Sequence, residues 1–369
     1  MSAEPKIYVR DIAQELESLA PKSYQEDYDN CGLLLGSHNS EVSGILFTLD
    51  VTIDVIEEAI KENCNLVIAH HPLIFKGLKK ITGSNEVEKC VIMAIKNDIA
   101  IYAIHTNLDN VSKGVNYKIG EKLGMKNMKI LSPKNHLLKK LVVFVPIKAV
   151  ENVTKALFAT GAGNIGNYSE CSFQVEGVGT FRPDINANPS IGEALKLENV
   201  EEKRVEIIYP LHLETKVLKA LHQSHPYEEP AFDLIEISNA TEVGAGMIGE
   251  LDNKMDETEF LQHLKDRLNL NLIRHTKLLG RRVKKIAWCG GTGSFLLSTA
   301  IRQNADIFIS SDFKYHEFFQ AEQNIVIADI NHYEAEVFTK ELLYEYLMKK
   351  FCNIALVLSK VNSNPIGYL

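Results

Sequence analysis

Short apolar runs alternate with amphipathic segments along most of this 369-residue chain. Six runs rich in Val, Ile, Leu and Ala have the length and composition of buried strands: Gly44–Leu49, Asn65–Ala69, Ile99–Ile104, Lys284–Trp288, Asp306–Ser310 and Ile325–Ala328. Three neighbouring segments repeat their apolar residues at helical spacing: Asp54–Asn63, Glu86–Lys96 and Glu334–Lys349. This alternation predicts an α/β fold of layered, mostly parallel sheets.

The stretch 139–239 has a different pattern. Its predicted elements are, in order, a strand, a helix, two strands, a further strand, a helix and a last strand: Lys140–Pro146, Val150–Thr160, two strands near Cys171–Phe181, Arg204–Tyr209, Leu213–Ser224 and Ala231–Ile237. This order is close to the β-α-β-β-α-β unit of ferredoxin-like domains. We therefore predict an α+β insert at 139–239 within a core formed by 1–138 and 240–369. Gly244, Gly246 and Gly249 are interpreted as a flexible return to that core.

Length, charge and composition limit the classes of protein to which this chain can belong. A chain of 369 residues suits two or more domains. The formal net charge of −8 and the pI near 5.9 argue against a nucleic-acid partner, which needs clustered basic residues. No apolar run approaches the roughly 18 residues that cross a bilayer, so we expect a cytoplasmic protein without a membrane partner. The six cysteines form no C-x-x-C pair, which disfavours a disulfide framework or a zinc knuckle.

Imidazoles and carboxylates follow the predicted strands. In an open α/β sheet, ligands bind outside the carboxyl ends of the strands. Here those ends carry metal-binding or titratable residues: Asp50, His70, His71, His105, Asp312 and His332. With only 12 histidines in the chain, several separate strand ends that each carry one indicate a shared site.

The adjacent pair His70 and His71 suits one ligand for each of two ions, because their side chains diverge where the strand ends. Asp109 lies four residues beyond His105, close enough for both to face the same cavity. Glu336 follows His332 by four residues at a predicted helix start. Side chains at i and i+4 share one helix face.

Imidazole nitrogens and carboxylate oxygens without thiolates favour zinc, manganese, iron or cobalt. We predict two divalent metal ions, with zinc as the first choice and Glu336 as the candidate bridge. Two such ions would acidify a shared water for attack on a substrate. The predicted ligands are His70, His71, Asp109, His332 and Glu336.

Three features have two interpretations. His105 is predicted to be catalytic as a proton shuttle, or to orient Asp109 from outside the metal shell. Asp312 and His316 either line the cleft or are structural. The segment WCGGTGSFL, at 288–296, either binds an anion through backbone N–H groups or makes a tight strand-to-helix turn.

Six motifs resemble those of the Nif-three-like family, whose bacterial members are often described as GTP cyclohydrolase 1 type 2 homologues. They occur in order along nearly the whole chain: DYDNCGLLLG (Asp27–Gly36), VIAHHPLIF (Val67–Phe75), HTNLDN (His105–Asn110), CGGTGS (Cys289–Ser294), SSDFKYHE (Ser310–Glu317) and INHYEAE (Ile330–Glu336). Two small departures are SSD where members often have TGD, and NHY where they often have GHY.

The resemblance implies a Nif-three-like core with a dinuclear metal site on the five residues predicted above, and a ring-shaped homohexamer. It also implies that the insert is a PII- or CutA-like domain, since HPYEEPAFD (His225–Asp233) is similar to the closing segment of CutA-like domains. Such domains tend to form trimers, which would cap a hexameric ring.

Two functions follow from these expectations. The first is a metal-dependent hydrolase of a small polar or nucleotide-like substrate, similar to GTP cyclohydrolase. The second is a metal-binding regulatory or adaptor protein whose PII-like insert senses a small-molecule effector or a partner. Neither the substrate nor the ligand of the insert follows from the sequence.

Overall fold

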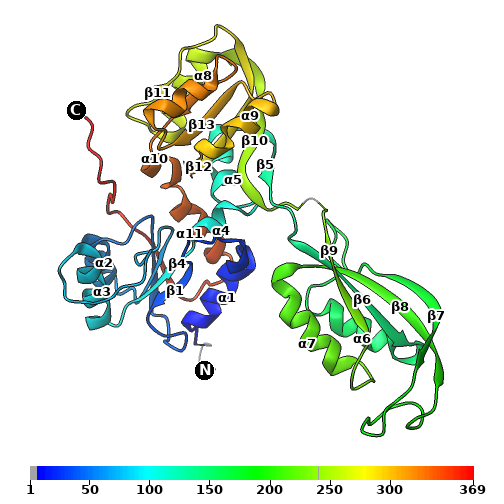
Figure 1. Cartoon of the computed structure of the whole chain (residues 1–369). Coiled ribbons are helices and arrows are strands. Elements are labelled where there is room, and N and C mark those ends of the chain that lie inside the picture. Colours follow the sequence, from blue (N-terminus) through cyan, green and yellow to red (C-terminus); the bar gives the residue numbers. More distant parts are fainter. Residues whose placement is uncertain (1–5, 240) are drawn as a thin grey trace. The chain divides into compact units, whose positions relative to one another are not determined.

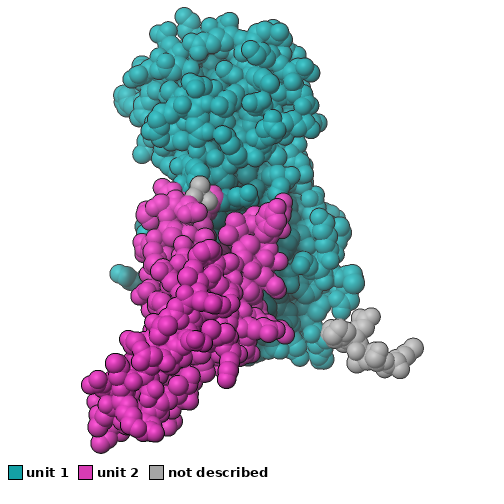
Figure 2. Space-filling view, turned by 90° about the vertical axis from the view of Figure 1, so that its right-hand side faces the viewer, with its two compact units in different colours: residues 1–133, 242–369 teal, residues 134–241 magenta. Residues whose placement is uncertain are grey.

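The computed structural model describes residues 6–239 and 241–369, and the chain divides into two compact units. Unit 1 comprises 1–133 and 242–369, and unit 2 comprises 134–241 (Figure 2). Unit 2 includes the stretch 139–239 that the sequence pattern set apart, with a few residues on either side.

Unit 1 contains a five-stranded sheet in the order β1-β4-β3-β2-β15, of which Figure 1 labels β1 and β4. Strands β2, β3, β4 and β15 are parallel, and β1 is antiparallel to β4. Helices α2 and α3 pack on the sheet through a core that includes Leu46, Val55 and Val67. The element bounds are α1 Val9–Leu19, β1 Gly32–Leu35, β2 Gly44–Thr48, α2 Ile53–Lys61, β3 Leu66–Ala69, α3 Glu86–Lys96, β4 Ala100–Ala103 and β15 Ala355–Leu358.

A second, six-stranded sheet of unit 1 has the order β11-β14-β13-β12-β10-β5. Strands β12, β13 and β14 are parallel, and the other pairings are antiparallel. The predicted α/β architecture is confirmed, but the expectation of mostly parallel strands is wrong for this sheet, since three of its five pairings are antiparallel. The bounds are α5 Val115–Leu123, β5 Lys126–Pro133, β10 Gly244–Asp256, α8 Glu257–Leu268, β11 Arg274–His275, β12 Arg282–Thr292, α9 Leu297–Arg302, β13 Ile307–Ser311 and β14 Val326–Asp329.

Three further helices of unit 1 are α4, α10 and α11. The predicted helix Glu334–Lys349 is in fact two helices, α10 His332–Glu336 and α11 Thr339–Met348. Helix α10 contacts β12 and β13 of the second sheet, whereas α11 contacts β2 and β15 of the first. One straight helix would not follow both sheets, so the chain changes direction between them. Helix α4, Thr106–Asp109, follows β4.

The glycines near 246 are not a flexible linker, contrary to the interpretation from the sequence. They lie inside β10, which pairs with β5 and β12. A Cβ at Gly244 would lie 2.2 Å from Ser132 O, and one at Gly246, where φ is +63°, would lie 2.9 Å from Trp288 O. These glycines therefore allow close contact between neighbouring strands.

Unit 2 is a four-stranded antiparallel sheet in the order β7-β8-β6-β9, with helices α6 and α7 packed against it. Where two strands were predicted near Cys171–Phe181, there is one, and Arg204–Tyr209 is the end of a longer strand. The side chains of Phe173 and Val178 on β7 are exposed, so apolar character does not mark burial there. The bounds are β6 Leu138–Pro146, α6 Val150–Phe158, β7 Phe173–Phe181, β8 Glu198–Pro210, α7 Glu214–Ser224 and β9 Phe232–Ile237.

Within residues 6–239 and 241–369, none of the helices combines the length and the apolar character needed to cross a bilayer.

Candidate metal centre

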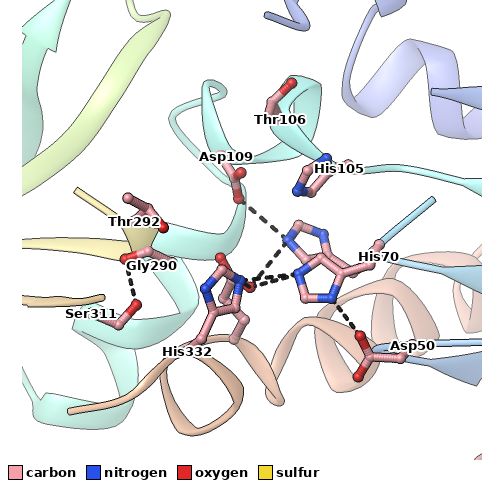
Figure 3. A network of polar contacts seen from close by, with 12 residues as sticks. Asp50, His70, His105, Thr106, Asp109, Gly290, Thr292, Ser311 and His332 are labelled. Atoms are coloured by element: carbon pink, nitrogen blue, oxygen red, sulfur yellow. Dashed lines mark hydrogen bonds and ion pairs between the residues drawn. The ribbon is translucent and has the colours of Figure 1, made fainter. Parts of the chain in front are cut away.

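The five predicted ligands come together in unit 1. His70 and His71 directly follow β3, Asp109 ends α4, and His332 and Glu336 begin and end α10. Figure 3 shows His70, Asp109 and His332 directed toward a common space. Their donor atoms form overlapping groups within 4.8 Å that could hold a metal ion: His70 with Asp109 and Glu336, His71 with His332 and Glu336, and His70 with His71 and His105.

Glu336 is at the centre of the cluster. Its Oε2 atom lies 2.9 Å from His71 Nε2, 3.0 Å from His332 Nε2 and 3.9 Å from His70 Nε2. The side chain of Glu336 is 3% exposed, so its charge is removed from solvent. One carboxylate thus contributes to two groups of potential ligands, which is the arrangement expected of a bridging ligand.

Two atoms of the cluster are buried without a hydrogen-bond partner among the described residues. They are His70 Nε2 and Asp109 Oδ1, which lie 3.6 Å apart. Buried polar atoms are nearly always paired, because an unpaired one loses its hydration without compensation. A cation between the imidazole and the carboxylate would satisfy both, so these residues fit a metal ion.

Each of the three histidines among the predicted ligands is held through its Nδ1 atom. His70 Nδ1 lies 2.8 Å from Ile104 O, His71 Nδ1 lies 2.6 Å from Asp50 Oδ1, and His332 Nδ1 lies 2.6 Å from an oxygen of an aspartate on the loop after β13. All three rings therefore present Nε2 to the cluster. Partners of this kind orient the rings of metal-binding histidines in proteins.

The cluster perturbs the ionisation of its members. Burial lowers the pKa of His70 to about 4. Burial also opposes the charge of His71, but hydrogen bonds with Asp50 and Glu336 raise its pKa to about 9. Burial and then the charge of Glu336 raise the pKa of Asp109 well above its usual value. Buried carboxylates this close repel one another when both are ionised, and a cation between them would favour the ionised form of both.

One glycine of β12 makes room for the central carboxylate. A Cβ at Gly291, where φ is +61°, would lie 2.3 Å from Glu336 Oε1, whereas one at Gly290 would lie at an ordinary contact distance of 3.5 Å from Glu336 Cγ. The segment 288–296 does lead from a strand into a helix. However, β12 extends to Thr292, and the close approach of Glu336 requires glycine at position 291.

Comparison with known proteins identifies the family of this chain. The family model of Duf34/NIF3 (NGG1p interacting factor 3) matches residues 7–365. The chain belongs to this family. The family match confirms the resemblance of the six motifs to those of the Nif-three-like family.

Relatives match along nearly their entire length. A Bacillus subtilis (strain 168) protein named GTP cyclohydrolase 1 type 2 homolog is 38% identical over 365 residues, with 97% of this chain and 98% of that protein covered. A Staphylococcus aureus (strain MSSA476) protein of the same name is 35% identical, with 98% and 100% covered. A crystal structure of a Bacillus cereus protein related to NIF3 has a TM-score of 0.85 at 38% identity, with 100% of both chains covered.

His105 lies beside the cluster in this Duf34/NIF3 chain. Its ring centroid is 5.2 Å from that of His70 and 5.3 Å from that of His71. Its Nδ1 lies 2.8 Å from Asp29 Oδ1, and the Asp29 side chain is fully buried and also accepts a hydrogen bond from Thr106 N. No role for Asp29 followed from the sequence, although it lies in the DYDNCGLLLG motif.

Asp312 and His316 have different positions. Asp312 Oδ2 lies 2.6 Å from both His332 Nδ1 and Thr292 Oγ1, so it orients a predicted ligand. His316 is exposed and contacts the rings of Tyr315 and Phe319 instead of the cluster.

Asn331 occupies the position at which members of the Duf34/NIF3 family often have glycine. Its φ is +65° and its ψ is 159°, a backbone conformation that is adopted almost only by glycine. A glycine in the corresponding GHY motif would adopt it without strain. The strained residue immediately precedes His332 and sets the start of α10.

Proposed function

We propose that unit 1 binds two divalent metal ions and catalyses hydrolysis of a small polar or nucleotide-like substrate. One ion is held by His70, Asp109 and Glu336, and the other by His71, His332 and Glu336. The observation that carries the proposal is the shared Glu336 carboxylate together with the unpartnered, buried His70 Nε2 and Asp109 Oδ1. Zinc is the first choice, and manganese, iron or cobalt suit the same donors.

Two such ions polarise a substrate oxygen and make water more acidic at neutral pH. Residues of the chain supply proton transfer and its positioning. His105 is the proposed proton carrier, because one of its ring nitrogens lies within 4.8 Å of those of His70 and His71. Asp29 holds Nδ1, which leaves Nε2 for proton transfer.

The name GTP cyclohydrolase 1 type 2 homolog, carried by the relatives, suggests a nucleotide or cyclic amide substrate. The test is hydrolysis by the metal-loaded protein across nucleotides, including GTP, and cyclic amides. We expect turnover that is lost in Glu336→Ala and retained in His316→Ala, since His316 lies outside the cluster. Two bound ions without turnover of any compound would refute the hydrolase and leave a metal-binding protein.

A second candidate function is regulation through unit 2, proposed here as a PII- or CutA-like sensor. It is favoured by a cavity of about 600 Å³ in unit 2, a size typical of small-molecule sites. The cavity lining combines aromatic rings with charged groups: Phe144, Phe181, Glu202, Arg204 and Tyr227. A metabolite that raises the melting temperature of the full chain, and has no effect on Tyr227→Ala, would support this function.

A homohexamer is proposed from the family resemblance. Light scattering of the purified chain tests it, with six times 41.4 kDa as the expected mass. A monomer or dimer at micromolar concentration would refute this assembly.

A further inference from the structure

A row of rings leads from the candidate metal centre to the surface of unit 1. The His105 ring centroid lies 5.3 Å from that of His71, Phe75 lies 6.3 Å from His105, and Tyr28 lies 6.2 Å from Phe75. Exposure increases along this row: 15% for the His105 side chain, 42% for Phe75 and 66% for Tyr28. Aromatic surface is therefore continuous from the predicted ligands to solvent.

Neighbouring residues anchor the backbone beside each of the two exposed rings. Asp29, next to Tyr28, is bound to His105 Nδ1 at 2.8 Å. Asn30 Nδ2 donates a hydrogen bond of 2.6 Å to Ile74 O, next to Phe75. The rings are thus presented by two tied segments, which limits the entropy lost when a ligand contacts them.

The exposed rings have no evident role in the folding of unit 1. Leu73, two residues before Phe75, packs against the hydrophobic core, so the same loop has already buried an apolar side chain. Solvent exposure of two large rings side by side is unfavourable, and exposed apolar patches commonly mark binding sites. Phe75 contacts the His105 ring and Tyr28 contacts Phe75, so the pair points to a binding surface for a substrate of the metal centre.

We propose that Tyr28 and Phe75, whose ring planes are tilted by 42°, form an aromatic platform for a flat, unsaturated ring in the substrate, whose reacting group lies at the metal centre. This inference rests on the proposed function and specifies its substrate class. Aromatic faces and edges attract other aromatic rings in offset or edge-to-face arrangements. A saturated ring of similar size lacks this attraction, so the platform selects flat rings.

The test compares two metal-chelating probes on the full-length, metal-loaded protein. Benzohydroxamic acid and cyclohexanecarbohydroxamic acid carry the same hydroxamate on a flat and on a saturated ring. Calorimetry should show about tenfold tighter binding of the flat probe, the size expected for one aromatic pair. We expect the Tyr28→Leu and Phe75→Leu variants to lose this preference, with unchanged affinity for the saturated probe.

Tyr168→Leu in unit 2 is the matched control, since Tyr168 is 76% exposed and should not affect the preference. Equal affinity of the two probes for the unaltered protein would overturn the platform and leave the metal centre intact. Binding of neither probe to protein with two metal equivalents would refute an open catalytic centre, and thus the proposed function. A platform variant that keeps the preference but changes the mass in light scattering would assign the rings to a subunit contact.

Discussion

His71 Nε2 and Glu336 Oε2 lie 2.9 Å apart although 265 positions separate them in the chain. The contact joins the end of β3 in the first sheet of unit 1 to α10, which packs on the second sheet. The candidate metal centre therefore depends on how the two sheets meet.

The shared carboxylate predicts unequal effects of ligand substitutions. Glu336→Ala removes a donor from both ligand groups, whereas Asp109→Ala removes one from a single group. We expect bound metal to fall below one equivalent in Glu336→Ala and to about one equivalent in Asp109→Ala. Elemental analysis of folded protein measures this difference. Two full equivalents in Glu336→Ala would contradict the bridging role.

Gly291→Ala should damage the centre more than the backbone conformation alone explains. The new Cβ would lie 2.3 Å from Glu336 Oε1 at a φ of +61°. Gly280→Ala is the control, because φ is +73° there and no atom lies within 4 Å of the added Cβ. We expect about 1 kcal/mol of destabilisation in the control and roughly 2–4 kcal/mol, with reduced metal content, in Gly291→Ala. Equal destabilisation of the two variants in urea unfolding would show that the Glu336 side chain moves aside at no cost in stability.

Asn331→Gly should stabilise the protein. The φ of +65° and ψ of 159° are strained for asparagine and allowed for glycine. Relief of this strain should exceed the entropy cost of a glycine, with a net gain of about 1 kcal/mol. Urea unfolding of metal-free protein measures the gain without a contribution from metal affinity. A loss of stability would mean that the Asn331 side chain supports the turn.

Glu88 should make stability depend on acid pH. Hydrogen bonds from the backbone N–H groups of Ser84 and Thr82, and from the Thr82 hydroxyl, lower its pKa to about 2 from 4.5. The folded-state pKa lies below the unfolded one, so the stabilisation is complete above pH 4.5 and is lost as pH falls toward 2. Glu88→Gln should therefore be less stable than the unaltered protein at pH 6, with a difference that shrinks toward pH 3. A difference independent of pH would show that the ionised carboxylate is not responsible.

Local patterns were sufficient for much of the fold and for the choice of candidate ligand residues, which the structure brings together. Apolar runs predicted the strands β2, β3 and β4, and helix α3 has the predicted bounds Glu86–Lys96. The spacing of His332 and Glu336 indicated a shared helix face, because four residues make about one helical turn. These features depend on neighbours along the chain, so the sequence reports them directly.

Long-range packing decided the rest. The contact of Asp29 with His105 spans 76 positions, and that of Asp50 with His71 spans 21. No local pattern shows which carboxylate will reach which imidazole, since many arrangements of the sheets satisfy the same hydrophobic periodicity. The break between α10 and α11 likewise follows from contacts with two different sheets. By itself the sequence determined the strands and the residues at their ends; the tertiary structure decided how those residues face one another, because that depends on the packing of two sheets distant in the chain.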